Sequence, residues 1–184
     1  SSSGVDLGIP AQWQHKDTSM LCLEGCPLTG THAWDIDHLT RPCLHCDWYC
    51  VRASISMVNS YFGGNVKRLS QDRISYYVLQ ERSPDAIPEN DLGHGRGLYP
   101  SETTDGLSWA LMGAAISMIS PKPTFADIKS WIDNGRPILR RDVGSPWHAT
   151  VIDGYEEDGT ERVHVIDPWT GTESSVSYAT LPVH

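Results

Sequence analysis

Three residues of the chain, Cys50, His148 and Asp167, combine side-chain types and positions suited to nucleophilic catalysis. Cys50 immediately precedes an apolar-periodic segment, where the unpaired N–H groups and dipole of a predicted helix favour a thiolate. His148 opens a predicted strand directly after a Gly/Pro break (GSPWHATVIDGY), which leaves its ring at the edge of an element. Asp167 ends the next predicted strand (VIDPWTG) and is expected beside His148 across a hairpin. A nucleophile, a base and an orienting carboxylate in this order predict acyl transfer through a thiol.

The other cysteines form a separate group. The chain has five cysteines, and four of them lie in two close pairs, Cys22 with Cys26 and Cys43 with Cys46. Paired cysteines with these spacings suit a four-cysteine zinc site, and they equally suit two disulfides that brace a loop. In either case Cys50 remains as the one free thiol.

Composition excludes several functional classes. The net charge of −9 leaves no basic patch to neutralise phosphates, which argues against nucleic-acid binding. The longest apolar run, WALMGAAI at 109–116, is too short to span a membrane and is predicted to be buried. We expect no signal peptide within this chain, and residues 1–8 (SSSGVDLG) are expected to be a flexible leader or vector-derived segment, so a native signal could have been removed. Residues 9–184 have the length of one domain.

All the predicted helices come before Gly135. Apolar residues spaced by three or four predict a helix from Val51 to Phe62, ended by two glycines. Ser70 is the expected N-cap of a second helix, and Thr124 with Asp127 forms a capping-box-like start to another through Trp131. A further helix is predicted over 107–118, after a long loop over 83–106 that contains His94. Loops of that length are often functional, although a solvated connector is the simpler interpretation.

After Gly135 the apolar period changes from about four to two. Four strands are predicted in the segments PILRRDV, HATVIDGY, RVHVIDP and ESSVSYA, with EEDGTE as a hairpin loop. Helices first and an antiparallel sheet second predict an α+β fold with two segregated halves. A catalytic pair drawn from both halves would meet between them.

At these residues the chain resembles the papain-like cysteine peptidases. The segment CVRASISMVNSYFGG is similar to the nucleophile helix of the bacteriocin-processing (double-glycine leader) peptidases and their stand-alone relatives. GRPIL, HATVIDGYEEDG and VHVIDPWTG resemble the sequence around that group's catalytic His and Asp, and AvrRpt-type peptidases share the DPW feature. The resemblance covers about residues 47–180. It implies a papain-like layout, with the active site between an N-terminal helical half and a C-terminal antiparallel sheet.

The chain departs from the family pattern in two places. Val51 follows the cysteine where the family usually has Gly, and Leu44 stands where the family places an oxyanion-stabilising Gln. The segment IPAQWQ at 9–14 resembles the family's opening segment, so Gln14 is the expected oxyanion donor and Gln12 a weaker candidate. The cysteine-rich stretch at about 22–46 is then an insertion between this Gln and the nucleophile.

The resemblance implies a peptidase that hydrolyses peptide bonds of a peptide or protein substrate through a thioester on Cys50. Two alternatives stay open: another acyl-transfer enzyme with the same triad, such as a deamidase or a transglutaminase-like enzyme, and a non-enzymatic zinc-stabilised binding module. Catalysis would need no cofactor, and a structural zinc on Cys22, Cys26, Cys43 and Cys46 is the one metal expectation. The acidic balance and the secreted habit of similar peptidases favour disulfides and a secreted or extracytoplasmic, bacterial-type protein. The sequence leaves the oligomeric state and the cleavage specificity open.

Overall fold

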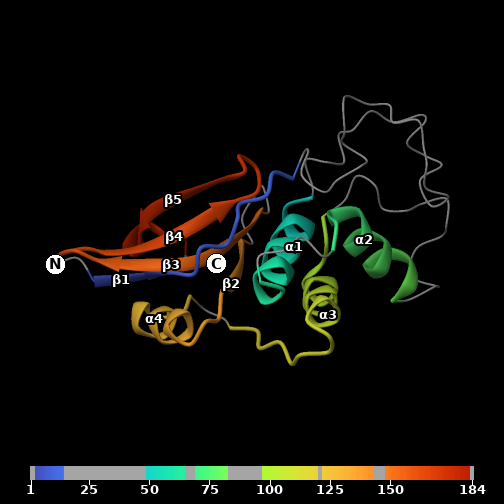
Figure 1. Ribbon diagram of the computed structural model, residues 1–184, viewed down its shortest axis with the longest axis horizontal. Helices are drawn as coiled ribbons and strands as arrows, with labels where there is room; N and C mark the ends of the chain where they lie inside the picture. Colours follow the sequence, from blue (N-terminus) through green and yellow to red (C-terminus); the bar gives the residue numbers. More distant parts are fainter. Residues whose placement is uncertain are drawn as a thin grey trace.

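The computed structural model describes residues 3–14, 49–64, 69–82, 97–119, 122–142 and 148–182, and it consists of a sheet with helices at one end and on one face. Figure 1 shows the sheet in one half of the molecule, α1, α2 and α3 in the other, and α4 against the sheet. Segregated helices and an antiparallel sheet confirm the expected α+β, papain-like layout. None of the described helices is both long enough and apolar enough to cross a membrane.

The sheet contains five antiparallel strands, arranged around β3. The strands are β1 (Ser3–Asp6), β2 (Ile138–Asp142), β3 (His148–Glu157), β4 (Glu161–Asp167) and β5 (Thr172–Ser177). β4 pairs with one edge of β3 and with β5 on its other side. β2 and β1 pair with successive parts of the remaining edge of β3, at residues 148–152 and 154–157 respectively. The predicted strands β2 to β5 and the hairpin loop are therefore confirmed.

Strand β1 is a feature that the sequence did not predict. Residues 1–8 were expected to be a leader outside the fold, yet Ser3–Asp6 pairs with β3. The N–H of Leu7 then donates to the carbonyl of Asp153 over 2.8 Å and continues this attachment. A four-residue segment of Ser, Gly, Val and Asp has little β propensity, so the free edge of β3 decides its conformation.

The helices follow the predicted order, with one change of bounds. They are α1 (Cys50–Phe62), α2 (Gln71–Tyr76), α3 (Pro100–Ala110) and α4 (Phe125–Asp133), and α2 continues as a π-helical turn over Tyr77–Glu81. A short 3-10 turn, Tyr178–Thr180, follows β5. The predicted caps are confirmed: Ser70 Oγ accepts the N–H of Arg73 over 3.0 Å, and Thr124 Oγ1 accepts the N–H of Asp127 over 3.1 Å.

The helix predicted over 107–118 instead begins at Pro100, inside the predicted loop, and ends at Ala110. Its start is stabilised by Glu102, whose carboxylate accepts the N–H of Tyr99 over 2.8 Å, and by Pro100 at the first helical position. Proline is favourable there because that residue's N–H would be unpaired in any case. Its end is set by Gly113, whose N–H donates to the carbonyl of Ser108 over 2.8 Å in the left-handed conformation (φ 86°).

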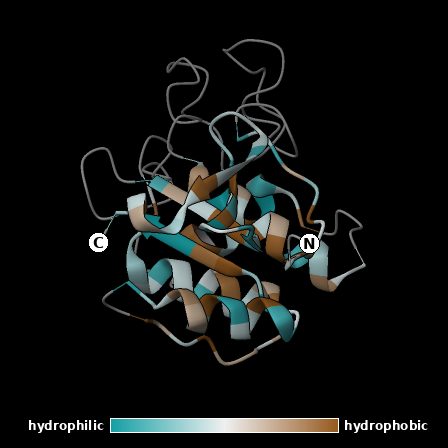
Figure 2. Cartoon of the chain, turned by 90° about the vertical axis from the view of Figure 1, so that its left-hand side faces the viewer, coloured by the Kyte–Doolittle hydropathy of each residue, from teal (hydrophilic) through white to brown (hydrophobic). Residues whose placement is uncertain are grey.

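Apolar packing joins the two halves of the molecule. One cluster lies among the helices, a second lies between α4 and the sheet, and a third connects α1 with β3, β4 and the segment after β1. The central strands are largely hydrophobic in Figure 2, whereas the helices carry both hydrophobic and hydrophilic residues. Helix α1 contributes to the first and the third cluster, and every residue from Cys50 to Ser60 is buried. It therefore holds its first residue, Cys50, in a fixed position relative to β3.

Candidate active site

His148 and Asp167 form a short hydrogen-bonded pair between the start of β3 and the end of β4. The distance from His148 Nε2 to Asp167 Oδ1 is 2.6 Å. The same carboxylate oxygen accepts the backbone N–H of Trp169 over 2.8 Å, which fixes its orientation. The antiparallel pairing of β3 with β4 brings together two residues that are 19 positions apart in sequence. Because Nε2 faces Asp167, Nδ1 is the ring nitrogen left to face a reacting group.

Cys50, the first residue of α1, is buried, with 5% of the residue exposed. It lies near His148 and contributes to the raised pKa of that imidazole. It stands at the helix N-terminus with Tyr49 as the N-cap residue. The structure therefore brings the three predicted residues, Cys50, His148 and Asp167, together from both halves of the molecule.

The charges of this group favour an imidazolium. Burial works against a charged His148, but its hydrogen bonds with Asp167 and Cys50 outweigh that effect and raise its pKa to about 10. Burial of Asp167 also disfavours its charge, yet the hydrogen bonds from His148 and from the N–H of Trp169 hold the pKa of this carboxyl below its ordinary value. A cation beside a cysteine sulfur favours the thiolate, which is the nucleophilic form.

The segment at 9–14 passes the turn that follows Asp167. The N–H of Gln14 donates to the carbonyl of Pro168 over 2.9 Å, and the indole N–H of Trp13 donates to the carbonyl of Trp169 over 3.0 Å. Gln14 is fully buried, so its side chain lies inside the molecule beside the His148–Asp167 end of the sheet. Gln12 is also buried, but its N–H donates to the sulfur of Met57, two turns along α1 from Cys50.

Arg141 is a residue near the site that the sequence analysis did not single out. It lies on β2 opposite Ala149, and its guanidinium donates to the carbonyl of Leu98 over 2.8 Å. Burial lowers the pKa of Arg141, and the nearby Cys50 and Glu102 oppose that effect. Arg140 and Arg141 are adjacent in a predicted strand, and neighbouring residues in a strand point to opposite faces. One of the two arginines must therefore face the interior, which was the sequence signal available for Arg141.

Several predicted residues lie outside the described part of the chain. Cys50 is the one cysteine among the described residues, and Cys22, Cys26, Cys43 and Cys46 fall in the segment at 15–48. His94 also lies outside the described ranges. The zinc and disulfide alternatives therefore remain predictions.

Comparison with known proteins points to the same chemistry. A family model described as the Peptidase_C39 like family matches residues 34–181, which is most of the chain and includes Cys50, His148 and Asp167 but not Gln14. A search of curated proteins found no significant match. The matched family supports a cysteine peptidase acting on a peptide or protein substrate. On the extent of this match, the chain belongs to the Peptidase_C39 like family.

Proposed function

We propose that the protein hydrolyses peptide bonds through a Cys50–His148–Asp167 triad. The Cys50 thiolate attacks the carbonyl carbon of the scissile peptide, and the tetrahedral intermediate collapses to a thioester as His148 protonates the leaving amine. A water molecule then attacks the thioester, His148 accepts its proton, and the acid product leaves with regeneration of the thiol. Asp167 orients the imidazole and stabilises its cationic form.

One observation supports this proposal: Asp167 accepts a hydrogen bond from His148 over 2.6 Å, and Cys50 is near enough to contribute to the raised pKa of the same imidazole. A base within hydrogen-bonding distance of its nucleophile, and itself held by a third group, is the arrangement that thiol acyl transfer requires. A cysteine kept only for packing would not need a hydrogen-bonded His–Asp pair beside it.

The test is cleavage of a peptide library by the wild type and by Cys50→Ala, with Ser101→Ala as a control because Ser101 is exposed on α3. We expect Cys50→Ala to abolish cleavage while its thermal unfolding stays like that of the wild type. The control should cleave at the wild-type rate. Release of ammonia without cleavage of the peptide chain would mean that the protein is a deamidase with the same triad and not a peptidase. Alkylation of Cys50 at neutral pH no faster than in the denatured chain would contradict an activated thiol.

The same assay tests the oxyanion donor that we propose, Gln14, against a matched control, Gln12. Both glutamines are buried, so both alanine variants remove a comparable side chain from the interior. Loss of one oxyanion donor lowers kcat by about 10²–10³-fold, and we expect that loss for Gln14→Ala alone. Equal turnover of the two variants would remove Gln14 from the proposed mechanism.

A further inference from the structure

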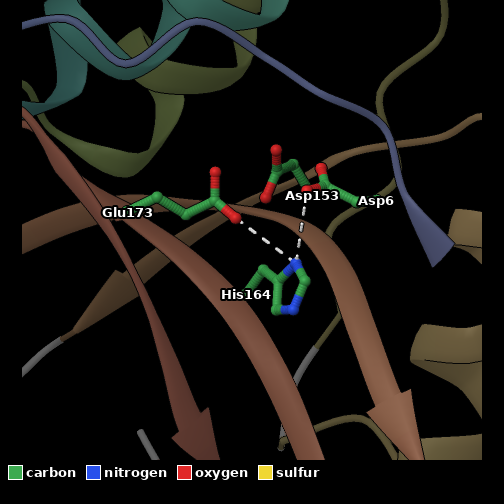
Figure 3. A group of neighbouring side chains, drawn as sticks. All are labelled: Asp6, Asp153, His164 and Glu173. Carbon is green, nitrogen blue, oxygen red and sulfur yellow. Dashed lines mark ion pairs between the residues drawn. The ribbon is translucent and has the colours of Figure 1, made fainter. Parts of the chain in front are cut away.

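Four side chains from four strands converge at a second place on the sheet (Figure 3). They are Asp6 on β1, Asp153 on β3, His164 on β4 and Glu173 on β5, and one possible ligand atom from each lies within 4.8 Å of the other three. His164 Nδ1 lies 3.3 Å from Glu173 Oε1 and 3.7 Å from Asp6 Oδ2. The triad uses none of these residues.

A β-bulge explains why Asp153 points into this group. The pairing of β3 with β4 shifts between Ile152 and Gly154, which leaves Asp153 as an extra residue in β3. Ile152 and Tyr155 both pack in the α4 cluster although they are three residues apart, so the two residues between them share the opposite face. His164 lies on that opposite face too, because its neighbours Val163 and Val165 belong to the α4 cluster.

Gly154 makes room for the imidazole. It pairs with Asp6 on one side and with His164 on the other. A Cβ at this position would lie 2.7 Å from His164 Nδ1 and 2.6 Å from the carbonyl oxygen of Val5. Only glycine therefore lets the ring of His164 lie across β3 toward Asp6 and Asp153.

The buried carboxylate of Asp153 is an independent sign that a ligand is needed. Asp153 is 0% exposed; its Oδ2 accepts the N–H of Ile9 over 3.2 Å, but its Oδ1 is buried and has no hydrogen-bond partner. A buried carboxylate oxygen without a partner is costly. A cation between the carboxylates would give this oxygen a partner.

The other nitrogen of His164 is held in the way that metal-binding histidines usually are. His164 Nε2 lies 2.7 Å from Glu156 Oε1, and Glu156 is itself held by the hydroxyl of Ser175. A proton on Nε2 directs the lone pair of Nδ1 toward the three carboxylates, as in carboxylate–histidine–metal arrangements. The alternative is a protonated Nδ1 that donates a hydrogen bond to one of the carboxylates. The distances from Nδ1 to Glu173 Oε1 (3.3 Å) and to Asp6 Oδ2 (3.7 Å) are, however, longer than the 2.7–2.9 Å typical of charge-assisted hydrogen bonds.

We propose that Asp6, Asp153, His164 and Glu173 bind one divalent transition-metal ion, Zn²⁺ or Mn²⁺. An imidazole combined with carboxylates suits these ions, whereas Ca²⁺ and Mg²⁺ prefer oxygen ligands alone. Three carboxylates supply enough negative charge for a divalent ion, and the exposed Asp6 and Glu173 leave a path for its entry. Because each ligand comes from a different strand, the ion would fasten β1 onto β3, β4 and β5 and act on stability rather than on the chemistry of Cys50.

The test is thermal unfolding of the metal-stripped protein with added Zn²⁺, Mn²⁺ or Ca²⁺, for the wild type, Asp153→Asn, Glu173→Gln and the control Glu161→Gln. Glu161 is an exposed carboxylate on β4 outside the group. At a metal concentration 100-fold above Kd we expect Zn²⁺ or Mn²⁺ to raise the Tm of the wild type and the control by about 5–10 °C. Both ligand variants should lose that rise, and Asp153→Asn without metal should unfold no earlier than the metal-stripped wild type, because the amide removes a buried charge.

Zinc bound to the paired cysteines would also raise the Tm. A further variant therefore distinguishes the strand site from the cysteine site. A variant with Cys22, Cys26, Cys43 and Cys46 changed to Ser should keep the rise if the strand site binds the ion. Absence of any rise with Zn²⁺ and Mn²⁺, or an equal rise in wild type and Glu173→Gln, would overturn the proposal. Glu173 is exposed, so Glu173→Gln keeps the test valid even if Asp153→Asn does not fold. Peptide cleavage by Cys50 does not enter these readouts, so the proposed function stands or fails separately.

Discussion

At the scale of single residues, the candidate site depends on one short hydrogen bond. His148 and Asp167 are each partly buried, and each stabilises the charged form of the other across 2.6 Å. The positions of both residues at strand ends were visible in sequence. The direction of the imidazole was not, because it depends on which nitrogen faces Asp167 and which faces Cys50.

This hydrogen bond makes stability depend on pH in a defined direction. Against burial, the hydrogen bonds with Asp167 and Cys50 raise the pKa of His148 from 6.5 to about 10, so its stabilisation is fully present below pH 6.5 and is lost as the pH rises toward 10. Despite burial, the pKa of Asp167 is lowered from 3.8, so its stabilisation is present above that pH and is lost in acid. We therefore expect the difference in free energy of unfolding between wild type and Asp167→Asn to be largest between pH 3.8 and pH 6.5, the ordinary pKa values of the two groups. The difference should shrink toward pH 10.

Urea denaturation at several pH values measures this difference. Asp158→Asn, an exposed change in the hairpin loop after β3, is the control and should show no such pH-dependent gap. A gap between wild type and Asp167→Asn that stays constant from weakly acid to alkaline pH would show that the pair does not titrate in the expected way.

At the scale of elements, α3 packs closely against α1, the helix that begins with Cys50. Gly106 on α3 lies against the turn that continues α2 and against α1: a Cβ there would approach Val78 Cγ2 to 2.9 Å and Ile55 Cδ1 to 3.3 Å. Both neighbours are 0% exposed, and the β-branched Val78 cannot easily turn away. The glycine thus permits a close helix contact despite its poor helix propensity.

Gly106→Ala should therefore destabilise the protein, although alanine is the better helix former. Overpacking costs about 1–3 kcal/mol and the propensity gain returns about 1 kcal/mol, so we expect a net loss of about 1 kcal/mol by urea denaturation. Ser101→Ala, on the exposed side of the same helix, should change stability by less than about 0.5 kcal/mol. A more stable Gly106→Ala would mean that α3 can move away from α1 without cost.

At the scale of the whole molecule, the two halves hold different parts of the candidate site. α1 supplies Cys50, the sheet supplies His148 and Asp167, and the segment at 9–14 crosses from β1 to the turn after β4. The cysteine-rich segment at about 22–46 lies between residues 9–14 and α1 in sequence. We propose that Cys22, Cys26, Cys43 and Cys46 brace this segment as two disulfides in a secreted or extracytoplasmic protein.

Intact mass with and without reductant tests the disulfides. Two disulfides predict that reduction adds four hydrogens, and that Cys50 is the one thiol alkylated before reduction in denaturant. A control variant, Cys50→Ala, should show the same gain on reduction and no alkylation before it. Four further reactive thiols together with bound zinc would favour the metal alternative.

The fold was predictable where local signals agree. The two-residue period after Gly135, the hairpin loop and the caps at Ser70 and Thr124 predicted four strands and two helix starts that the structure confirms. The start of α3 was missed because Tyr99 is an unusual N-cap residue and Pro100 also suits a loop. Strand β1 was missed because its pairing depends on an edge of β3 about 150 residues away.

The sequence by itself determined which residues are chemically competent: a thiol at a helix start, a histidine and an aspartate at strand ends, and an order along the chain that resembles the papain-like peptidases. Only the tertiary structure decided which of them meet, because strand register and the packing of α1 on β3 fix side chains that are far apart in sequence. The same holds for Asp6, Asp153, His164 and Glu173, which no spacing rule would group. A one-residue bulge places Asp153 among them, and a bulge follows from the pairing of strands rather than from local residue preference.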